Sequence, residues 1–151
     1  MARIEWVGGF RTGWLLLAAL LPSTPIALRA QNAAEADSAD AHRAALAWLA
    51  LVDSGRYAAS LDSAAPLLRE MITSPEQWAE FLAVSREGFT VLRRELLIAE
   101  LDPSLPVVPP GRYIRLTFRI TGRKSEATES VVLQAQPTGW RVAMYGVQNN
   151  S

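Results

Sequence analysis

Few residues in this chain are suited to chemistry. It has a single histidine, His42, and no cysteine, so histidine- or thiol-based catalysis and a zinc site have little to be built from. Asp37 and Asp40 lie close to His42 in sequence and suggest a metal cluster. We interpret them instead as the polar start of a helix, where the helix dipole stabilises carboxylates. No glycine-rich phosphate loop follows the first thirty residues, and the sequence predicts no catalytic residue, metal or cofactor.

One carboxylate, Glu129, breaks the expected pattern. It shares strand parity with Val131 and Leu133, so if those two side chains point inward, the carboxylate points inward beside them. A buried carboxylate needs hydrogen-bond partners because its desolvation is costly. Tyr57 and Tyr113 are candidate donors, although parity puts Tyr113 on the opposite face of its own strand. The alternative, which we favour, is that Glu129 lies at the end of the strand and reaches water.

Aromatic and cationic side chains raise two binding hypotheses. Trp48, Trp78 and Trp140 fall on predicted core faces, which favours ordinary packing over a ligand site. Four arginines invite an anion-binding hypothesis, but alternating strands place charges on their solvent face, where Glu95 can balance them. These arginines are Arg93, Arg115, Arg119 and Arg141. If the domain binds a ligand, the candidate residues are Trp48, Tyr57, Trp78, Glu129 and Trp140.

Residues 1–30 have the three-part layout of a secretory signal peptide. Arg3 and Arg11 give a positive start, Trp14–Leu21 is an apolar run, and Pro22–Ala30 is a polar, helix-breaking tail. The alternative is an uncleaved membrane anchor, but a spanning helix needs about 20 apolar residues and this run is shorter. We therefore predict cleavage after Ala30, no membrane span in the mature protein, and export to the periplasm or out of the cell.

Residues 31–151 are predicted to form a single domain, since this length can bury a core without disulfides or metal. Once Arg3, Arg11, Arg29 and Glu5 leave with the signal peptide, acidic residues slightly outnumber basic ones. This balance gives no electrostatic reason to expect nucleic acid or an anionic membrane as a partner.

Three helices are predicted in the first half of the domain. After a frayed lead-in over residues 31–40, the first runs from about residue 37 to 54, with an apolar stripe at helical spacing and a stop at Gly55. Its second apolar face, at Leu46, Ala47 and Ala50, is either covered as well, which we favour, or meets a partner subunit. A second helix starts near residue 56, breaks at Pro66 and continues over 67–72. The third begins at an N-cap, Ser74, in a capping box with Gln77.

After Gly88 the pattern changes to the period of two that is typical of strands. The stretch 91–101 is rich in branched residues, and 113–120 alternates cleanly between apolar and polar side chains. A polar turn around Gly122 leads to two strands, 128–136 and 140–147, joined by a glycine-containing hairpin connection. The order predicts an α+β fold, with three N-terminal helices packed on an antiparallel sheet of about four strands.

Several strings, taken in order, resemble one family. They are Ala47–Leu49 with Asp53–Tyr57, then Ser74–Trp78, Glu129–Leu133, and Gly139–Val142 followed by Tyr145. This series is similar to the bacterial domain of unknown function 4019, over nearly all of the mature chain. The resemblance implies a curved sheet wrapped around three helices, the cone of nuclear transport factor two and the ketosteroid isomerases, also called cystatin-like. Members of that fold often hold a cavity between helices and sheet, but the fold does not give the function.

Three functional hypotheses follow. The first is an exported, non-enzymatic domain that binds a small apolar ligand or another envelope protein. The second is a cavity enzyme of the isomerase or lyase kind, with Glu129 as general base and a tyrosine as donor to the developing oxyanion. The third is a structural homodimer formed through the exposed sheet face or the first helix.

Overall fold

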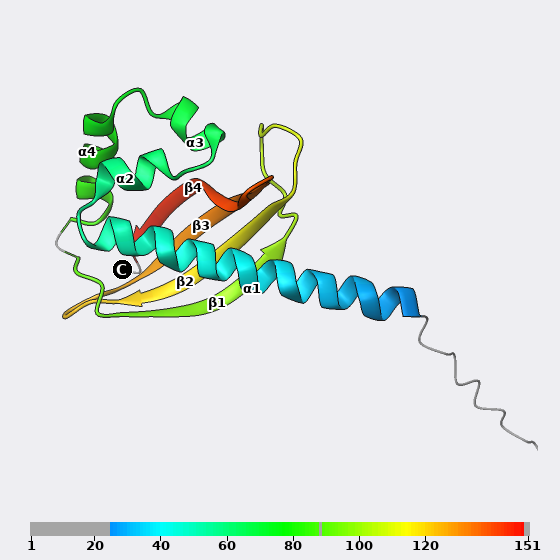
Figure 1. The fold of residues 1–151 in the computed structure, drawn as a ribbon. Helices are drawn as coiled ribbons and strands as arrows, with labels where there is room; N and C mark the ends of the chain where they lie inside the picture. Colours follow the sequence, from blue (N-terminus) through cyan, green and yellow to red (C-terminus); the bar gives the residue numbers. More distant parts are fainter. Residues whose placement is uncertain (1–24, 88, 150–151) are drawn as a thin grey trace, which may run out of the picture.

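Helices precede a four-stranded antiparallel sheet in the computed structural model, which describes residues 25–87 and 89–149 (Figure 1). The helices are α1 (Pro25–Asp53), α2 (Tyr57–Asp62), α3 (Pro66–Met71) and α4 (Pro75–Ser85). The strands are β1 (Arg93–Leu101), β2 (Tyr113–Thr121), β3 (Glu126–Gln136) and β4 (Gly139–Asn149). The predicted α+β order is confirmed, with four helices rather than three. Most of the predicted signal peptide, residues 1–24, lies outside the described residues.

The sheet is a meander in which each strand pairs with the next, in the order β1-β2-β3-β4. On β2 the alternation predicted from the sequence is confirmed: Ile114, Leu116, Phe118 and Ile120 are all buried on the face that carries the core. A register shift lies between Leu96 and Ile98 in β1, and another between Val132 and Leu133 in β3. The β3–β4 connection turns at Gly139, whose φ of 111° favours glycine.

The first helix is longer than the sequence predicted. It begins at Pro25 rather than near residue 37, so residues 31–40 are helical and not frayed, and Pro25–Ala30 does not break the helix. The physical reason is that proline fits the first turn of a helix, while the following residues are rich in alanine and contain no further glycine or proline. Its N-terminal part extends away from the sheet (Figure 1). The helix stops at Gly55, as predicted, with φ 73° there.

The second apolar face of α1 is not covered. Leu46, Ala47 and Ala50 are exposed, so the expectation that this helix would be covered twice is wrong. The opposite stripe, with Ala41, Ala45 and Val52, is buried against the sheet.

The predicted break at Pro66 is confirmed and separates α2 from α3. Ala65, just before the proline, is extended, and its N–H donates to the carbonyl of Val142 in β4 at 2.8 Å. This bond ties the helical segment to one edge of the sheet. The backbone of Gln77 donates to Ser74 Oγ at 3.1 Å, which confirms the N-cap of α4. The Gln77 side chain accepts from Thr73 rather than from the Ser74 amide, so the capping box is only half formed.

The core is centred on two tryptophans that share one serine. Trp48 donates from Nε1 to the Ser60 carbonyl at 2.7 Å, and Trp78 donates to Ser60 Oγ at 2.9 Å. Both rings also pack near the ring of Tyr145. Phe81, on the same helix as Trp78, stacks on the Trp78 ring and is 40% exposed. In the described part of the chain, no helix is long and apolar enough to cross a bilayer.

Candidate functional site

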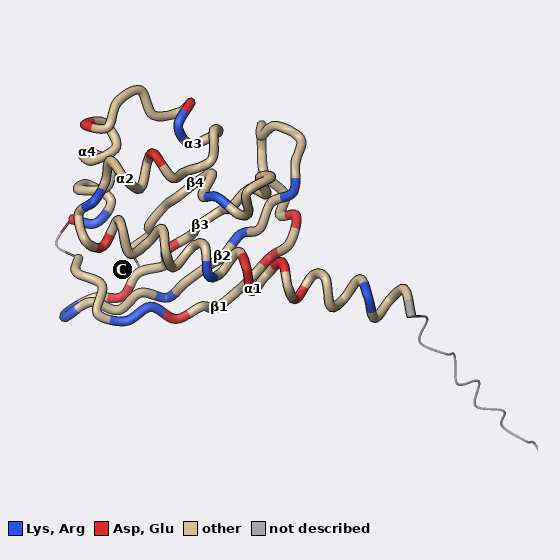
Figure 2. The backbone as a smooth tube through the Cα atoms, in the orientation of Figure 1, with Lys and Arg blue, Asp and Glu red and all other residues tan. Residues whose placement is uncertain are grey.

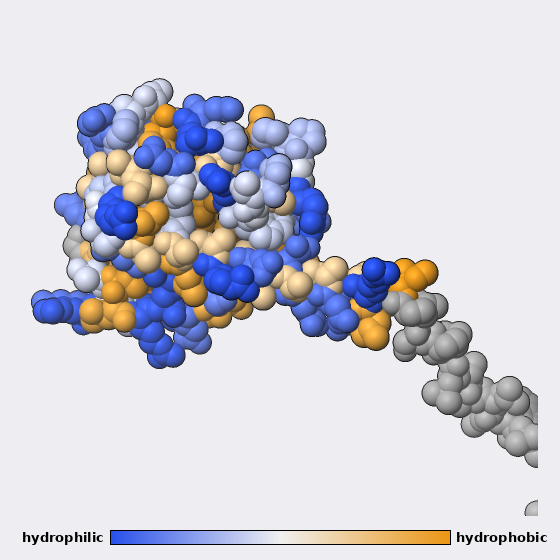
Figure 3. Space-filling model, in the orientation of Figure 1, coloured by the Kyte–Doolittle hydropathy of each residue, from blue (hydrophilic) through white to orange (hydrophobic). Residues whose placement is uncertain are grey.

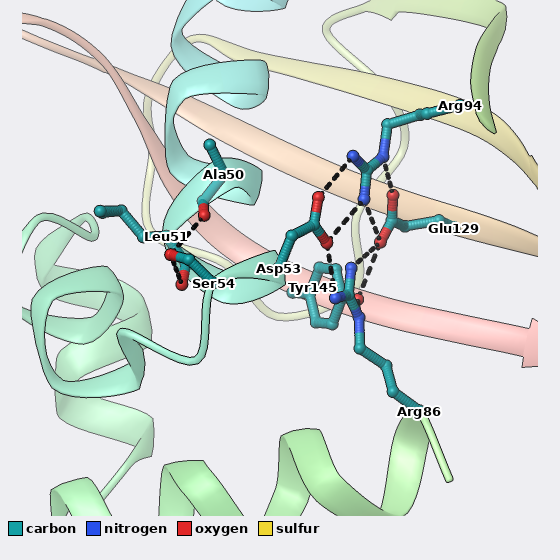
Figure 4. A network of polar contacts seen from close by, with 8 residues as sticks. All are labelled: Ala50, Leu51, Asp53, Ser54, Arg86, Arg94, Glu129 and Tyr145. Atoms are coloured by element: carbon teal, nitrogen blue, oxygen red, sulfur yellow. Dashed lines mark hydrogen bonds and ion pairs between the residues drawn. The ribbon is translucent and has the colours of Figure 1, made fainter. Parts of the chain in front are cut away.

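A buried ionic network surrounds Glu129 in the middle of β3. The glutamate is fully buried and does not reach water, so the favoured alternative of a solvent-exposed strand end is wrong. Its Oε1 accepts from Arg86 Nη2 at 2.7 Å and from the hydroxyl of Tyr145 at 2.9 Å. Its Oε2 accepts from Arg94 Nε at 2.6 Å. Figure 4 shows the two guanidinium groups on either side of the carboxylate.

Asp53, the last residue of α1, completes the network from the solvent side. Its Oδ1 lies 2.7 Å from Arg86 Nη1, and its Oδ2 lies 2.9 Å from Arg94 Nη1. The Asp53 side chain is 33% exposed, whereas those of Arg86 and Arg94 are 11% and 12% exposed. Two carboxylates thus balance two guanidiniums, and the group joins the ends of α1 and α4 to three strands.

The network changes the acidity of its members in a consistent way. Burial opposes ionisation of Asp53, but the hydrogen bonds and charges of Arg94 and Arg86 outweigh it and lower the pKa of that carboxyl. Burial also disfavours the charged arginines, yet their acidic neighbours raise the pKa of both Arg86 and Arg94. Burial and the Glu129 charge raise the pKa of Tyr145 well above its ordinary value. The Tyr145 hydroxyl therefore keeps its proton at neutral pH and donates a hydrogen bond to Glu129.

Strand register explains why these side chains meet. Arg94 pairs with Ile120 and Leu96 with Phe118, so Arg94 points to the core face before the bulge in β1 turns the strand. Glu129 pairs with Phe118 on the other side of β2 and points to the same face. Sequence reasoning raised the inward carboxylate only as the less favoured alternative, and it missed the other members of the network, Asp53, Arg86, Arg94 and Tyr145. The sequence did contain one indication of a partner: Arg94 lies two residues before Leu96, so both side chains point to the core face of β1, where a buried arginine could pair with Glu129.

The two tyrosines expected as donors do not contact Glu129. Tyr57 lies at the start of α2 and lines a pocket of about 200 Å³ beside the network, with Asp53 and Arg86 in the same wall. Tyr113 points to the other face of the sheet, as parity predicted, and its hydroxyl donates to the Pro109 carbonyl at 2.9 Å.

A groove of about 330 Å³ lies between α1 and β4. One wall carries Ala44, Ala47 and Leu51, which follow one another at helical spacing along α1, and the other carries Trp140 and Val142. Trp48, Ser63 and Arg141 complete the lining.

The five predicted ligand residues therefore do not form one site. Trp48 and Trp140 share the groove, Tyr57 lines the pocket beside the network, and Trp78 and Glu129 are buried.

Three of the four arginines named in the sequence analysis form partly exposed ion pairs on the sheet. Arg93 and Arg119 both lie near Glu95, at 3.6 and 3.7 Å, and Arg115 pairs with Glu100 at 3.0 Å. The balancing role predicted for Glu95 is confirmed, and Figure 2 shows charges of both signs interspersed along the strands.

The acidic start of the predicted first helix is also paired. Asp37 forms an ion pair with Arg112, and Asp40 pairs with Arg43 at 3.0 Å. His42 lies against the ring of Phe118. Within residues 25–87 and 89–149, no group of three or more metal-ligating side chains comes together.

Comparison with known proteins identifies the family. The model of the family described as "Protein of unknown function (DUF4019)" matches residues 44–145, and the chain belongs to that family. No curated protein and no solved structure gives a match. The matched range contains the whole buried network and both tryptophans of the groove.

Proposed function

We propose that this member of the family is an exported, non-enzymatic domain that binds a small apolar ligand in the groove between α1 and β4. The observation that carries the proposal is the groove itself, where Trp140 and Val142 of β4 lie opposite a face of α1 with two alanines, Ala44 and Ala47. Its volume lies at the small end of the range for ligand pockets, about 300–1,000 Å³. Export is supported by the signal-peptide layout of residues 1–30, and places the domain in the periplasm or outside the cell.

The fold in this proposal is the cone of nuclear transport factor two, or cystatin-like fold. Family membership supports it, as does the packing of the helices on a meander sheet through β4. The groove lies where such a cone holds its cavity, between helices and sheet.

The alternative of an isomerase-like enzyme gains no support from Glu129. Both carboxylate oxygens accept from charged arginine donors, and the side chain lines neither the groove nor the pocket beside the network. A general base must reach its substrate's proton within hydrogen-bond distance. The geometry assigns Glu129 to holding the sheet and helices together.

A second candidate function is protein binding through the edge strand β1. Four large apolar side chains are exposed on or beside this strand: Leu92, Leu97, Ile98 and Leu101. Figure 3 shows hydrophobic patches between hydrophilic ones along the lower edge of the body, where β1 runs in Figure 1. Unpaired apolar edges pair readily with another chain, so this strand is the surface for an envelope partner or a homodimer. Light scattering tests the dimer: a monomeric mass at high protein concentration would exclude it.

The ligand proposal is tested with two matched variants of α1. Ala47→Phe fills the groove, whereas Ala50→Phe adds the same ring to an exposed position outside its lining. Thermal-shift screening against envelope lipids and apolar small molecules identifies a ligand, and titration calorimetry measures its affinity. We expect Ala47→Phe to abolish binding and Ala50→Phe to leave it unchanged. Equal binding by both variants would show that the groove is not the site.

A further inference from the structure

We propose that two copies of this chain associate by antiparallel pairing of their β1 strands, with Arg93 of each copy opposite Glu100 of the other. This inference rests on the second candidate function, protein binding through β1, and adds to it the partner, a second copy of this chain, and the register of the pairing. It does not depend on the groove, which lies beside β4 at the opposite edge of the sheet.

The two edges of the sheet differ in how far they are covered. At β4, the N–H of Ala65 donates to the carbonyl of Val142 at 2.8 Å, so the segment between α2 and α3 covers part of that edge. Within residues 25–87 and 89–149, the backbone of β1 is hydrogen-bonded to β2 and to no other segment, and Figure 1 shows β1 as the lower edge of the sheet. An open edge presents unpaired N–H and C=O groups that pair readily with another strand.

Large apolar side chains are exposed along this open strand. Leu97, Ile98 and Ala99 form a run of consecutive exposed apolar residues, which a strand edge in water normally lacks. Leu101 near the end of the strand is exposed as well, as is Leu92 just before its start. A neighbouring strand would bring apolar side chains against them, and such cross-strand contacts stabilise a sheet.

The bulge at Leu97 determines which residues of β1 share a face. Before the bulge, Arg93 lies on the face of the sheet opposite the core, where it pairs with Thr121. After the bulge, Glu100 lies on that same face, where it pairs with Arg115. In a regular strand these two positions would point to opposite faces, because an odd number of residues separates them. The bulge therefore allows Arg93 and Glu100 to lie opposite each other in a symmetric pair of strands.

The pairing of Arg93 with Glu100 is complementary along the whole strand. Because the two-fold axis repeats every contact, the two copies together form two opposite-charge pairs. The same register places Leu92 opposite Leu101 of the second copy, outside each charged pair, and brings the two Leu97 side chains together beside the axis. Apolar side chains thus meet at the centre and at both ends, with the charged pairs between them.

Other registers are less favourable. A shift by one residue would place side chains that point to opposite faces against each other. A shift by two residues in one direction places Glu95 opposite Glu100 of the second copy, where two like charges repel each other. The same shift in the other direction places Arg93 opposite Ile98, so both opposite-charge pairs are lost.

Both charged groups can accept a partner from a second copy. Arg93 is 74% exposed, and its Nη2 lies 3.6 Å from Glu95 Oε2, which is too far for a hydrogen bond. Glu100 is 47% exposed and accepts from Arg115 through Oε2. Its Oε1 accepts from no donor in the described part of the chain.

The experiment is a charge reversal in both members of the pair, with the dimer Kd of the purified protein measured by sedimentation equilibrium. Arg93→Glu and Glu100→Arg each place like charges opposite each other at two positions, and each should weaken the dimer about tenfold. In the double variant Arg93→Glu/Glu100→Arg, opposite charges face each other again, and the Kd should return close to that of the parent.

Two further variants separate the register from the strand itself. Arg119→Glu reverses a charge on the same face of the neighbouring strand β2 and should leave the Kd unchanged. Leu97→Lys places two ammonium groups beside the axis and should give a monomer. Circular dichroism on each variant establishes that it is folded.

Three results would overturn the proposal in whole or in part. A parent protein that stays monomeric at the highest concentration refutes the pairing of two copies, and β1 is then a surface for a different protein only. A dimer that survives Leu97→Lys does not form through β1. If Leu97→Lys gives a monomer but the double variant dimerises no better than the single ones, the register is wrong and the β1 interface stands. None of these results bears on the groove, which is tested by ligand titration of Ala47→Phe.

Discussion

Replacing Glu129 by glutamine tests whether the buried network is a structural element of the fold. The substitution keeps the size and shape of the side chain. It removes the negative charge and turns one acceptor oxygen into an N–H₂ group, which then faces an arginine donor instead of accepting from it. Arg86 and Arg94 are left with Asp53 as their one ionised partner in the network. The folded state would hold two nearly buried guanidiniums and a single carboxylate.

The magnitude follows from burial. Glu129 is fully buried and its arginine partners are 11% and 12% exposed, and removing one partner of a buried ion pair costs about 3–5 kcal/mol. The matched control is Glu100→Gln on β1, which makes the same chemical change in an ion pair at the surface, where Glu100 Oε2 lies 3.0 Å from Arg115 Nη1. The side chains of Glu100 and Arg115 are 47% and 32% exposed, so losing this pair should cost about 0–1 kcal/mol.

Urea denaturation followed by tryptophan fluorescence compares the two variants with the parent. Because small domains have a total stability of about 5–15 kcal/mol, Glu129→Gln should have a much lower midpoint, or little folded protein at all, while Glu100→Gln should unfold close to the parent. Circular dichroism on both variants distinguishes loss of folding from poor expression. Equal midpoints for Glu129→Gln and Glu100→Gln would refute the reasoning, since burial would then make no difference.

Four further predictions concern stability. Trp78→Ala should cost about 3–5 kcal/mol through lost burial and a cavity, whereas Phe81→Ala, at a half-exposed position on the same helix, should cost clearly less in the same urea titration. Ser74→Ala removes the N-cap of α4 and should cost about 1 kcal/mol. Tyr145→Phe removes the hydroxyl bonded to Glu129 and Arg86 and should cost about 1–3 kcal/mol. The pKa of Asp53 is lowered in the folded state, so the ionised carboxylate stabilises the fold above its unfolded-state pKa of about 3.9, and this contribution is lost as pH falls through the lower folded-state pKa. The free energy of unfolding, measured by urea titration at a series of acidic pH values, should therefore fall less steeply with decreasing pH in Asp53→Asn than in the parent. An equally steep fall in both proteins would contradict this.

The strands could be predicted because neighbouring residues along the sequence determine where each strand runs and which of its faces is buried. On β2 the alternation of apolar and polar residues fixes which side chains face the core, and the turns at Gly122 and Gly139 mark where the strands end. The break at Pro66 was predicted for the same kind of reason, since proline acts on its own helix.

The length of α1 and the partners of Glu129 depend on information that a local pattern does not contain. Alanine-rich residues 31–40 show no apolar stripe, yet helix propensity alone suffices to continue the helix there. The three partners of Glu129 are Arg86, Arg94 and Tyr145, which come from three other segments of the chain. Asp53, which bonds both arginines, lies at the end of α1. A single inward-facing carboxylate predicts that partners exist. It does not predict which elements supply them.

The network and the groove are linked through α1. Asp53 holds the C-terminal end of this helix to two arginines, while Trp48 and Leu51, within the two turns before it, line the groove. The width of the groove depends on where α1 lies over β4, and the network fixes one end of that helix against the sheet. The charges of the network are neutralised among themselves, so they add no net field at the groove. A substitution in the groove lining, such as Ala47→Phe, can therefore change the groove without removing any of the ion pairs that hold this end of α1.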